Sequence, residues 1–291
     1  MKKLLFAIFT LTFFLCACNS SVPADSIIAD YPQIAKPLNN AIEDVSHDES
    51  IPPIPEIPEM AEPEIETTAA VDNKTPEQNS KLVYLTFDDG PGKYTEQVLE
   101  ILDEYDVTAT FFMVGEYIGR RPERVQAVYE AGHLIGCHST KHAYKEIYQN
   151  KDTITADIEE WEKIISWAIG CVPEERVYRF PGGSNCSAIS SQKFPELHAA
   201  VNEYGYRAFD WTFSNNDLYY ADKMEDESLE DYLKRSLMLS YRIGGQPKIL
   251  LVHETVAETV EMLPWIIEYM RGEGYEFAPI SELEDEYLFA H

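Results

Sequence analysis

Side chains suited to metal and acid–base chemistry occur in short clusters from residue 88 onward. Asp88 and Asp89 precede a Gly-Pro turn. Neighbouring side chains of an extended chain point to opposite sides, so one carboxylate could bind a metal ion while the other acts as a base. His138 and His142 are four residues apart, a common spacing for two zinc ligands on one helical turn. Each cluster also has a plain structural interpretation, because Asp-Asp-Gly-Pro often forms only a turn and such a histidine pair often serves as a cap.

Three later clusters add an arginine, further carboxylates and another histidine. Arg179 precedes a Phe-Pro-Gly-Gly turn, in which Gly182 and Gly183 would present free backbone N–H groups. A guanidinium beside a buried carboxylate could hold that carboxylate ionised. The fourth cluster begins at Asp210, and the fifth is His253 at the end of an apolar segment. A histidine in that setting is by itself more often structural than catalytic.

Segments with strand character precede these clusters, and helical segments separate the strands. Strand patterns cover residues 81–87, 107–112, 133–138, 176–180, 206–209, 248–252 and 275–278. Helical patterns cover residues 94–105, 122–130, 154–169, 229–239 and 255–271. This alternation predicts an α/β fold of parallel βαβ units, as a sheet or an incomplete barrel. We expect the site at the C-terminal ends of the strands, because parallel strands end at one edge.

Taken together and in this order, the clusters resemble the five motifs of the polysaccharide deacetylases, the NodB-homology or carbohydrate esterase family 4 enzymes. The resemblance runs from about Lys81 to Ile280 and is carried by Thr-Phe-Asp-Asp-Gly-Pro, Ala-Thr-Phe-Phe, His-Ser-Thr-Lys-His, Arg-Phe-Pro-Gly and Leu-Val-His. It implies a distorted (β/α)7 barrel. It also implies a hydrolase of linear amides that removes N-acetyl groups from amino sugars of a peptidoglycan-like or chitin-like polysaccharide and releases acetate.

The resemblance further implies one divalent metal ion, with zinc as the first expectation and cobalt or nickel as alternatives. Its ligands would be Asp89, His138 and His142. Three protein ligands leave positions open for water and substrate. Asp88 matches the general base that deprotonates the attacking water, and Arg179 matches the arginine that holds this base.

For the departing amine, the resemblance assigns a general acid and its partner. His253 matches the histidine that protonates the amine. Asp217 is the expected carboxylate that orients and charges this histidine, and Asp210 is the competing candidate. Gly182 matches the residue whose backbone N–H stabilises the oxyanion.

Two positions depart from the family pattern, and both would line the sugar groove. Leu218 stands where many relatives carry an aromatic residue, and Gly182 stands where a tyrosine is common. We expect Leu251, Leu218, Trp211 and Tyr144 to contact substrate, with core packing as an equal alternative for Trp211. The departures weaken inferences about the substrate but leave the chemical step intact.

The N-terminal sequence predicts export and lipid attachment. Residues 1–18 combine two lysines with an apolar run over residues 4–15, too short to span a membrane, and end in Leu-Cys-Ala-Cys. This ending resembles the bacterial lipobox, which places a lipid on Cys18, with a plain secretory signal as the alternative. Residues 19–80 hold 13 acidic and 2 basic residues among repeated prolines, which predicts a disordered linker. The linker would lift an extracytoplasmic enzyme off the bacterial membrane or only add solubility.

Composition and charge bound the remaining possibilities. A net charge of −28 over 291 residues argues against nucleic acid as the main partner. We expect one catalytic domain over residues 81–284, a C-terminal tail over residues 285–291 and a monomer. An odd number of cysteines remains beyond the signal peptide, and a bridge between Cys171 and Cys186 is possible.

Two other function classes could use the same fold. A small-molecule amidase could share the metal scaffold, but the export signal and the linker count against it. A non-catalytic glycan-binding lipoprotein would have no need of the full set of chemical side chains. That set consists of Asp88, Asp89, His138, His142, Arg179 and His253.

Overall fold

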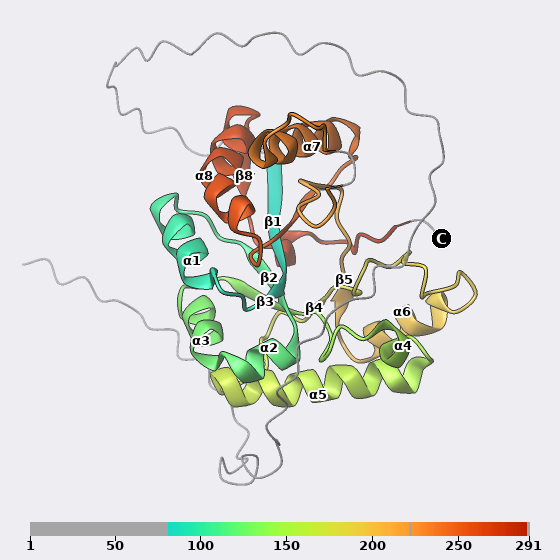
Figure 1. Ribbon diagram of the computed structural model, residues 1–291. Coiled ribbons are helices and arrows are strands. Elements are labelled where there is room, and N and C mark those ends of the chain that lie inside the picture. The colour runs from blue at the N-terminus through green and yellow to red at the C-terminus, as the bar shows by residue number, and fades with distance from the viewer. Residues whose placement is uncertain (1–80, 221–222, 290–291) are drawn as a thin grey trace, which may run out of the picture. The chain divides into compact units, whose positions relative to one another are not determined.

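The structure is a computed structural model that describes residues 81–220 and 223–289. The predicted signal peptide of residues 1–18, the linker of residues 19–80 and the lipid site Cys18 lie outside the described residues. Within the described chain, parallel strands form a curled, incomplete barrel with helices around it (Figure 1). No helix in this part of the chain is both long and apolar enough to cross a membrane.

The strands lie in the order β5-β4-β3-β2-β1-β7-β6, and β8 pairs with the start of β1. Their bounds are β1 (Lys81–Gly90), β2 (Thr110–Met113), β3 (Leu134–Cys137), β4 (Val177–Tyr178), β5 (Arg207–Ala208), β6 (Phe213–Ser214), β7 (Lys248–His253) and β8 (Tyr275–Phe277). All of these pairings are parallel, which confirms the predicted α/β barrel. The sequence pattern missed the two-residue strand β6.

Helices connect the strands and cover the outer side of the sheet (Figure 1). Their bounds are α1 (Thr95–Glu104), α2 (Gly115–Arg120), α3 (Pro122–Glu130), α4 (Tyr144–Ile147), α5 (Lys151–Ile169), α6 (Phe194–Glu203), α7 (Leu229–Ile243) and α8 (Ala257–Gly272), with a 3-10 turn, η2 (Ile280–Glu282). The five predicted helices correspond to α1, α3, α5, α7 and α8. The pattern missed α2, which has two glycines in six residues, α4, which is a single turn, and the ten-residue α6.

The two faces of the sheet bury different side chains. Val83, Leu85 and Phe87 of β1 belong to the large core between the sheet and the helices. Tyr84 lies on the other face and joins a smaller cluster inside the barrel with residues such as Phe209. This division follows from the strand period of two residues, and each large side chain so buried contributes about 1.5–3 kcal/mol.

Helix α5 is fixed at both ends and in its middle. The Asn150 side chain accepts hydrogen bonds from the first-turn N–H groups, at 2.9 and 3.1 Å, as an N-terminal cap. Gly170 ends the helix in the left-handed region with φ of 85°. Between them, the indole N–H of Trp161 donates to the Met113 carbonyl at 2.8 Å, which ties α5 to the C-terminal end of β2. This tie holds the helix beneath the edge where the site lies.

Candidate active site

The predicted site residues gather at the C-terminal edge of the strands. Asp88 of β1 and His253 of β7 are direct partners in the parallel register. The register with β2 shifts between Asp88 and Gly90, and Asp89 takes a left-handed backbone with φ of 63°. Both carboxylates consequently face His138 instead of opposite sides of an extended strand, at 3.7 Å from Asp88 and 3.6 Å from Asp89.

Asp89, His138 and His142 form a cluster with the composition of a metal site. One ligand atom from each residue lies within 4.8 Å of the others. Asp89 Oδ1 is 3.6 Å from His138 Nε2 and 3.5 Å from His142 Nε2. Ligand atoms on a tetrahedral zinc ion with bonds of about 2.0–2.1 Å would lie about 3.3 Å apart, so little movement would be needed.

The chemistry of the cluster also fits a cation. Asp89 Oδ1 is buried and has no hydrogen-bond partner among the described residues. Burial, and then the neighbouring His142, lower the pKa of His138 to about 3. His138 Nδ1 lies 2.9 Å from the Arg179 carbonyl, which fixes the ring and leaves Nε2 toward the cluster. The neutral imidazole and the orphaned carboxylate oxygen are the donors that a divalent metal ion requires.

His138 and His142 lie on a loop and not on the helical turn expected from their spacing. Ser139 and His142 both have positive φ, of 63° and 56°, and the Ser139 hydroxyl accepts the His142 N–H at 2.8 Å. Asp157 of α5 accepts the Thr140 N–H with both oxygens at 3.1 Å. The loop therefore owes its shape to these side-chain contacts, which a four-residue spacing does not encode.

Arg179 is fully buried and reaches Asp88. Its Nη1 donates to Asp88 Oδ1 at 2.8 Å and to the Thr86 hydroxyl at 2.7 Å. Its Nε and Nη2 donate to the carbonyls of Phe209 and Asp210 at 2.9 and 3.1 Å. The arginine is thus held by several acceptors, and its charge compensates that of the buried Asp88 carboxylate.

His253 is paired with Asp217, and Asp210 has a different environment. His253 Nδ1 lies 2.7 Å from Asp217 Oδ1, and the His253 backbone N–H donates to Oδ2 at 2.8 Å. Burial lowers the pKa of His253, but the hydrogen bond and charge of Asp217 outweigh it and raise the pKa to about 9. Asp210 instead accepts hydrogen bonds from Ser184 and Phe289. Of the two candidates, the geometry therefore pairs Asp217 with His253.

The turn after Arg179 presents one backbone N–H, not two. Gly182 and Gly183 have φ of 76° and 84°, a conformation that favours glycine. The Gly183 N–H donates to the Phe180 carbonyl at 2.8 Å, so the expectation that both groups are free was wrong for Gly183. The Gly182 N–H has no acceptor among the described residues. The phenol of Tyr144 lies beside it, since a Cβ added at Gly182 would be 2.9 Å from Tyr144 Oη.

The predicted groove residues differ in their exposure. Tyr144 and Leu218 are 37% and 46% exposed and can contact a substrate. Leu251 is only 7% exposed and offers little surface. Trp211 is half-buried and packs edge-on against Phe289, with ring centroids 5.0 Å apart. Packing, the alternative interpretation for Trp211, therefore describes its environment.

Glu254, which directly follows His253, is fully buried and was not predicted from the sequence as a site residue. Its carboxylate lies against the turn after Asp89, because a Cβ added at Gly90 would be 1.8 Å from Glu254 Oε1. Burial raises the pKa of Glu254 to about 7. The sequence signal that could have identified it is its position directly after a buried apolar strand, where a charged side chain is not necessarily exposed to solvent.

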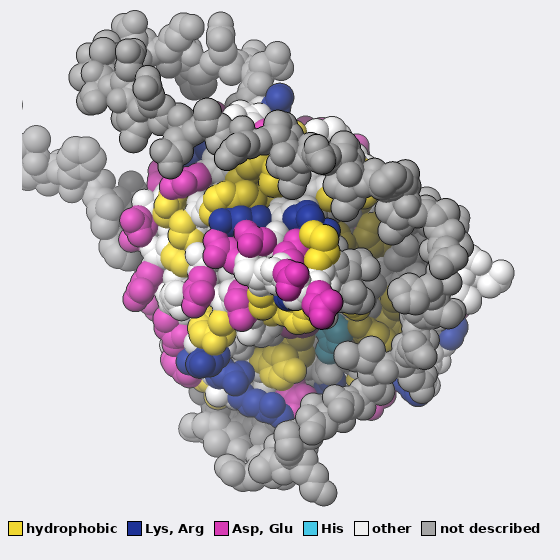
Figure 2. All heavy atoms as spheres, turned by 45° about the horizontal axis from the view of Figure 1, so that its top comes forward, with side chains coloured by type: hydrophobic (Ala, Val, Ile, Leu, Met, Phe, Trp, Pro, Cys, Tyr) yellow, Lys and Arg dark blue, Asp and Glu magenta, His cyan; other side chains and the backbone are white. Residues whose placement is uncertain are grey.

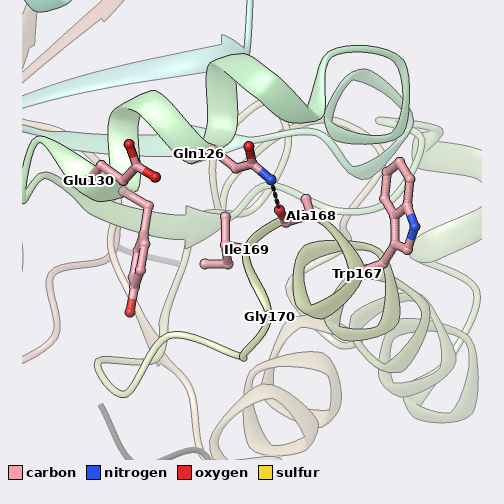
Figure 3. Close-up of a pocket in the computed structure, with 7 residues that line it drawn as sticks. Gln126, Glu130, Trp167, Ala168, Ile169 and Gly170 are labelled. Atoms are coloured by element: carbon pink, nitrogen blue, oxygen red, sulfur yellow. Dashed lines mark hydrogen bonds between the residues drawn. The ribbon is translucent and has the colours of Figure 1, made fainter. Parts of the chain in front are cut away.

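Other features of the described surface lie apart from these clusters. A cavity of about 410 Å³ lies between α3 and the end of α5, and Figure 3 shows side chains that line it. The cavity is lined by Gln126, Tyr129, Glu130, Trp167, Ala168, Ile169 and Gly170. None of these residues belongs to the five sequence clusters. Cys171 and Cys186 are not joined by a disulfide in the structure, so it does not contain the bridge considered from the sequence. Acidic side chains lie at many points of the described surface in view in Figure 2, among hydrophobic and basic ones.

Comparisons with known proteins agree with this geometry. The model of the polysaccharide deacetylase family matches residues 75–209. A peptidoglycan-N-acetylglucosamine deacetylase of Bacillus cereus is 30% identical over 225 residues, which cover 76% of this chain and 95% of that protein. A second protein of the same name and organism is 29% identical over 222 residues, covering 76% of this chain and 77% of that protein.

Solved structures show the same similarity. The catalytic domain of a peptidoglycan N-acetylglucosamine deacetylase from Eubacterium rectale matches with a TM-score of 0.63 and 27% identity, over 76% of this chain and 98% of that one. A polysaccharide deacetylase from Bacillus cereus matches with a TM-score of 0.58 and 29% identity, over 69% and 92%. This chain therefore belongs to the polysaccharide deacetylase family, the NodB-homology or carbohydrate esterase family 4 hydrolases.

Proposed function

We propose that this protein is a metal-dependent deacetylase that removes N-acetyl groups from the amino sugars of peptidoglycan. The observation that carries the proposal is that three groups of side chains lie together at the C-terminal ends of the strands. These are the cluster around Asp89, the pair of Asp88 and Arg179, and the pair of His253 and Asp217. The names of the two similar Bacillus cereus proteins support peptidoglycan as the substrate class.

Asp89, His138 and His142 would hold the metal ion. When bound, a divalent ion there would polarise the acetyl carbonyl and lower the pKa of a nearby water molecule. Zinc is the first expectation for a site of imidazole and carboxylate ligands, with cobalt or nickel as substitutes. The remaining steps belong to side chains and backbone groups of this chain.

In the proposed mechanism, Asp88 accepts a proton from the water that attacks the acetyl carbon. Arg179 donates to Asp88 Oδ1 at 2.8 Å, which places a compensating positive charge beside this base and fixes its orientation. The Gly182 N–H donates to the carbonyl oxygen as negative charge develops on it. As the C–N bond breaks, His253 Nε2 transfers its proton to the leaving nitrogen. The products are acetate and a free amine on the sugar.

We further propose that the enzyme works outside the cytoplasm as a monomer anchored to the bacterial membrane by a lipid on Cys18. The signal-like residues 1–18 and the acidic, proline-bearing linker of residues 19–80 support this proposal. The catalytic domain would then extend from residue 81 to about residue 284, followed by the short C-terminal segment. A tethered enzyme can reach only polymer within the length of its linker.

Acetate release from a panel of purified glycans tests the function. The panel should contain peptidoglycan, chitin oligosaccharides and small N-acetyl amides, each assayed with metal-stripped enzyme and after addition of Zn²⁺, Co²⁺ or Ni²⁺. We expect acetate from peptidoglycan that depends on added metal. Release from small amides alone would favour the amidase alternative, and no release from any substrate would favour a glycan-binding role.

A further inference from the structure

The last described residues of the chain lie beside the active-site turn. We call Tyr287–Phe289 the C-terminal strap. Tyr287 pairs in parallel with Phe209, just after β5, and its carbonyl accepts the Asp210 N–H at 2.6 Å. β5 is the edge strand at one end of the sheet, so the strap extends the sheet at an edge that would otherwise be open. The sequence had indicated only a tail in this region.

Asp210 joins the strap to the turn that follows Arg179. The Asp210 side chain is fully buried. Its Oδ1 accepts the Ser184 N–H at 2.9 Å, and its Oδ2 accepts the Ser184 hydroxyl at 2.5 Å and the Phe289 N–H at 2.7 Å. One carboxylate therefore holds both segments, and the Phe289 N–H also lies 3.2 Å from Ser184 Oγ.

The Phe289 ring packs against the same turn. A Cβ added at Gly183 would be 2.9 Å from the Phe289 ring and 3.0 Å from the Trp211 ring. Gly183 thus lies against two aromatic side chains, one of them from the strap. The Gly183 N–H closes the turn on Phe180, and the preceding residue is Gly182, whose N–H remains available.

We propose that the C-terminal strap is a positioning element of the active site, which holds the turn from Phe180 to Ser184 so that the Gly182 N–H is aimed at the developing oxyanion. The inference rests on the proposed deacetylation. The Phe209–Asp210 segment that pairs with the strap also supplies the two carbonyls that accept from Arg179. The strap therefore contacts the turn from Phe180 to Ser184. It also pairs with the segment whose carbonyls hold Arg179, the partner of Asp88.

The decisive variant is Phe289→Pro, because proline lacks the N–H that donates to Asp210. Proline also favours an extended conformation at the preceding residue, which a strand-like strap can accept. Phe289→Leu is the matched control, since it keeps the N–H and an apolar side chain. Asp210→Asn provides a second test that leaves the chain end intact and removes an acceptor from the three-bond junction.

For Phe289→Pro and Asp210→Asn, we expect kcat on N-acetylated oligosaccharides to fall about tenfold or more. Complete loss of an oxyanion donor lowers kcat by about 10²–10³-fold, which sets the upper range. KM and the affinity for Zn²⁺ should stay within about twofold of the wild type, because neither variant touches the metal cluster. Phe289→Leu keeps the N–H but changes the ring contact with Gly183, so it should lower kcat less than Phe289→Pro does.

Hydrogen–deuterium exchange supplies a readout that does not depend on catalysis. In Phe289→Pro and Asp210→Asn, the peptide spanning residues 180–186 should exchange faster, while peptides of β1 and α5 should not change. Unchanged kcat and unchanged exchange of this peptide in both variants would overturn the inference, as would equal rises in exchange throughout the domain. A wild-type enzyme that releases no acetate would instead refute the proposed function, and the exchange result would still decide whether the strap holds the turn.

Discussion

Replacing Asp217 by Asn should move the basic limb of the pH–rate profile. Burial alone lowers the pKa of His253, and the contact with Asp217 outweighs burial and raises the pKa to about 9. Asp89 and Asp88 add smaller contributions in the same direction. When Asp89 binds a divalent cation, its charge is compensated, so Asp217 becomes the principal source of the shift. Without Asp217, the pKa should return to the ordinary 6.5 or below.

The size of the effect follows from the fraction of His253 that carries the proton. The general acid must be protonated, so activity is lost as pH rises through its pKa. At pH 8 a group with a pKa of about 9 is about 90% protonated, whereas one with a pKa of about 6.5 is about 3% protonated. Asp217→Asn should therefore lower kcat/KM about 30-fold at pH 8 from protonation alone, and by much less near pH 5.5.

The assay is acetate release from an N-acetylated oligosaccharide, with kcat/KM measured from pH 5 to pH 10. Asp210→Asn is the matched control, because Asp210 does not contact His253 and its loss should lower the rate without moving the basic limb. A basic limb that stays near pH 9 in Asp217→Asn would refute the assignment of Asp217 as the partner of His253. A limb that moved in Asp210→Asn instead would support the competing candidate.

Three other variants test the remaining units. His138→Ala should lose Zn²⁺ and activity together, whereas His133→Asn, outside the cluster, should retain both; elemental analysis showing full zinc in His138→Ala would contradict the ligand assignment. Arg179→Met should lower the free energy of unfolding in urea by about 3–5 kcal/mol, because it leaves the Asp88 carboxylate buried without compensation; a loss below about 1 kcal/mol would argue against that role. Cys18→Ser should release the protein into the medium or leave an unprocessed precursor, and fractionation showing wild-type-like membrane association would argue against lipid attachment.

The sequence could predict the features that depend on local pattern. The apolar run ending in Phe87 and the run ending in His253 each fill a buried strand, so their periodicity and their polar ends were visible without coordinates. The same holds for α5, whose apolar spacing and terminal glycine are local signals. The order of the five clusters also carried the family resemblance, which the relatives confirm.

What the sequence could not supply is the pairing of residues distant along the chain. Asp210 and Asp217 were both candidates for His253, and only the three-dimensional arrangement places Asp217 Oδ1 at 2.7 Å from the ring. The bulge that turns Asp89 toward His138 arises from a register shift against β2, a strand some twenty residues away.

The difference between what the sequence could predict and what it could not has a physical cause. Strand and helix formation depend on the spacing of side chains over a few residues. A motif that directly follows a strand is therefore placed at the end of that strand. Site geometry depends instead on contacts that close long loops, such as that between Arg179 and Asp88 or between Phe289 and Asp210. The residues, their order and the chemistry available were thus determined by the sequence. Tertiary packing alone decided which carboxylate contacts His253, which glycine N–H has no acceptor among the described residues, and that Phe289 lies against the turn after Arg179.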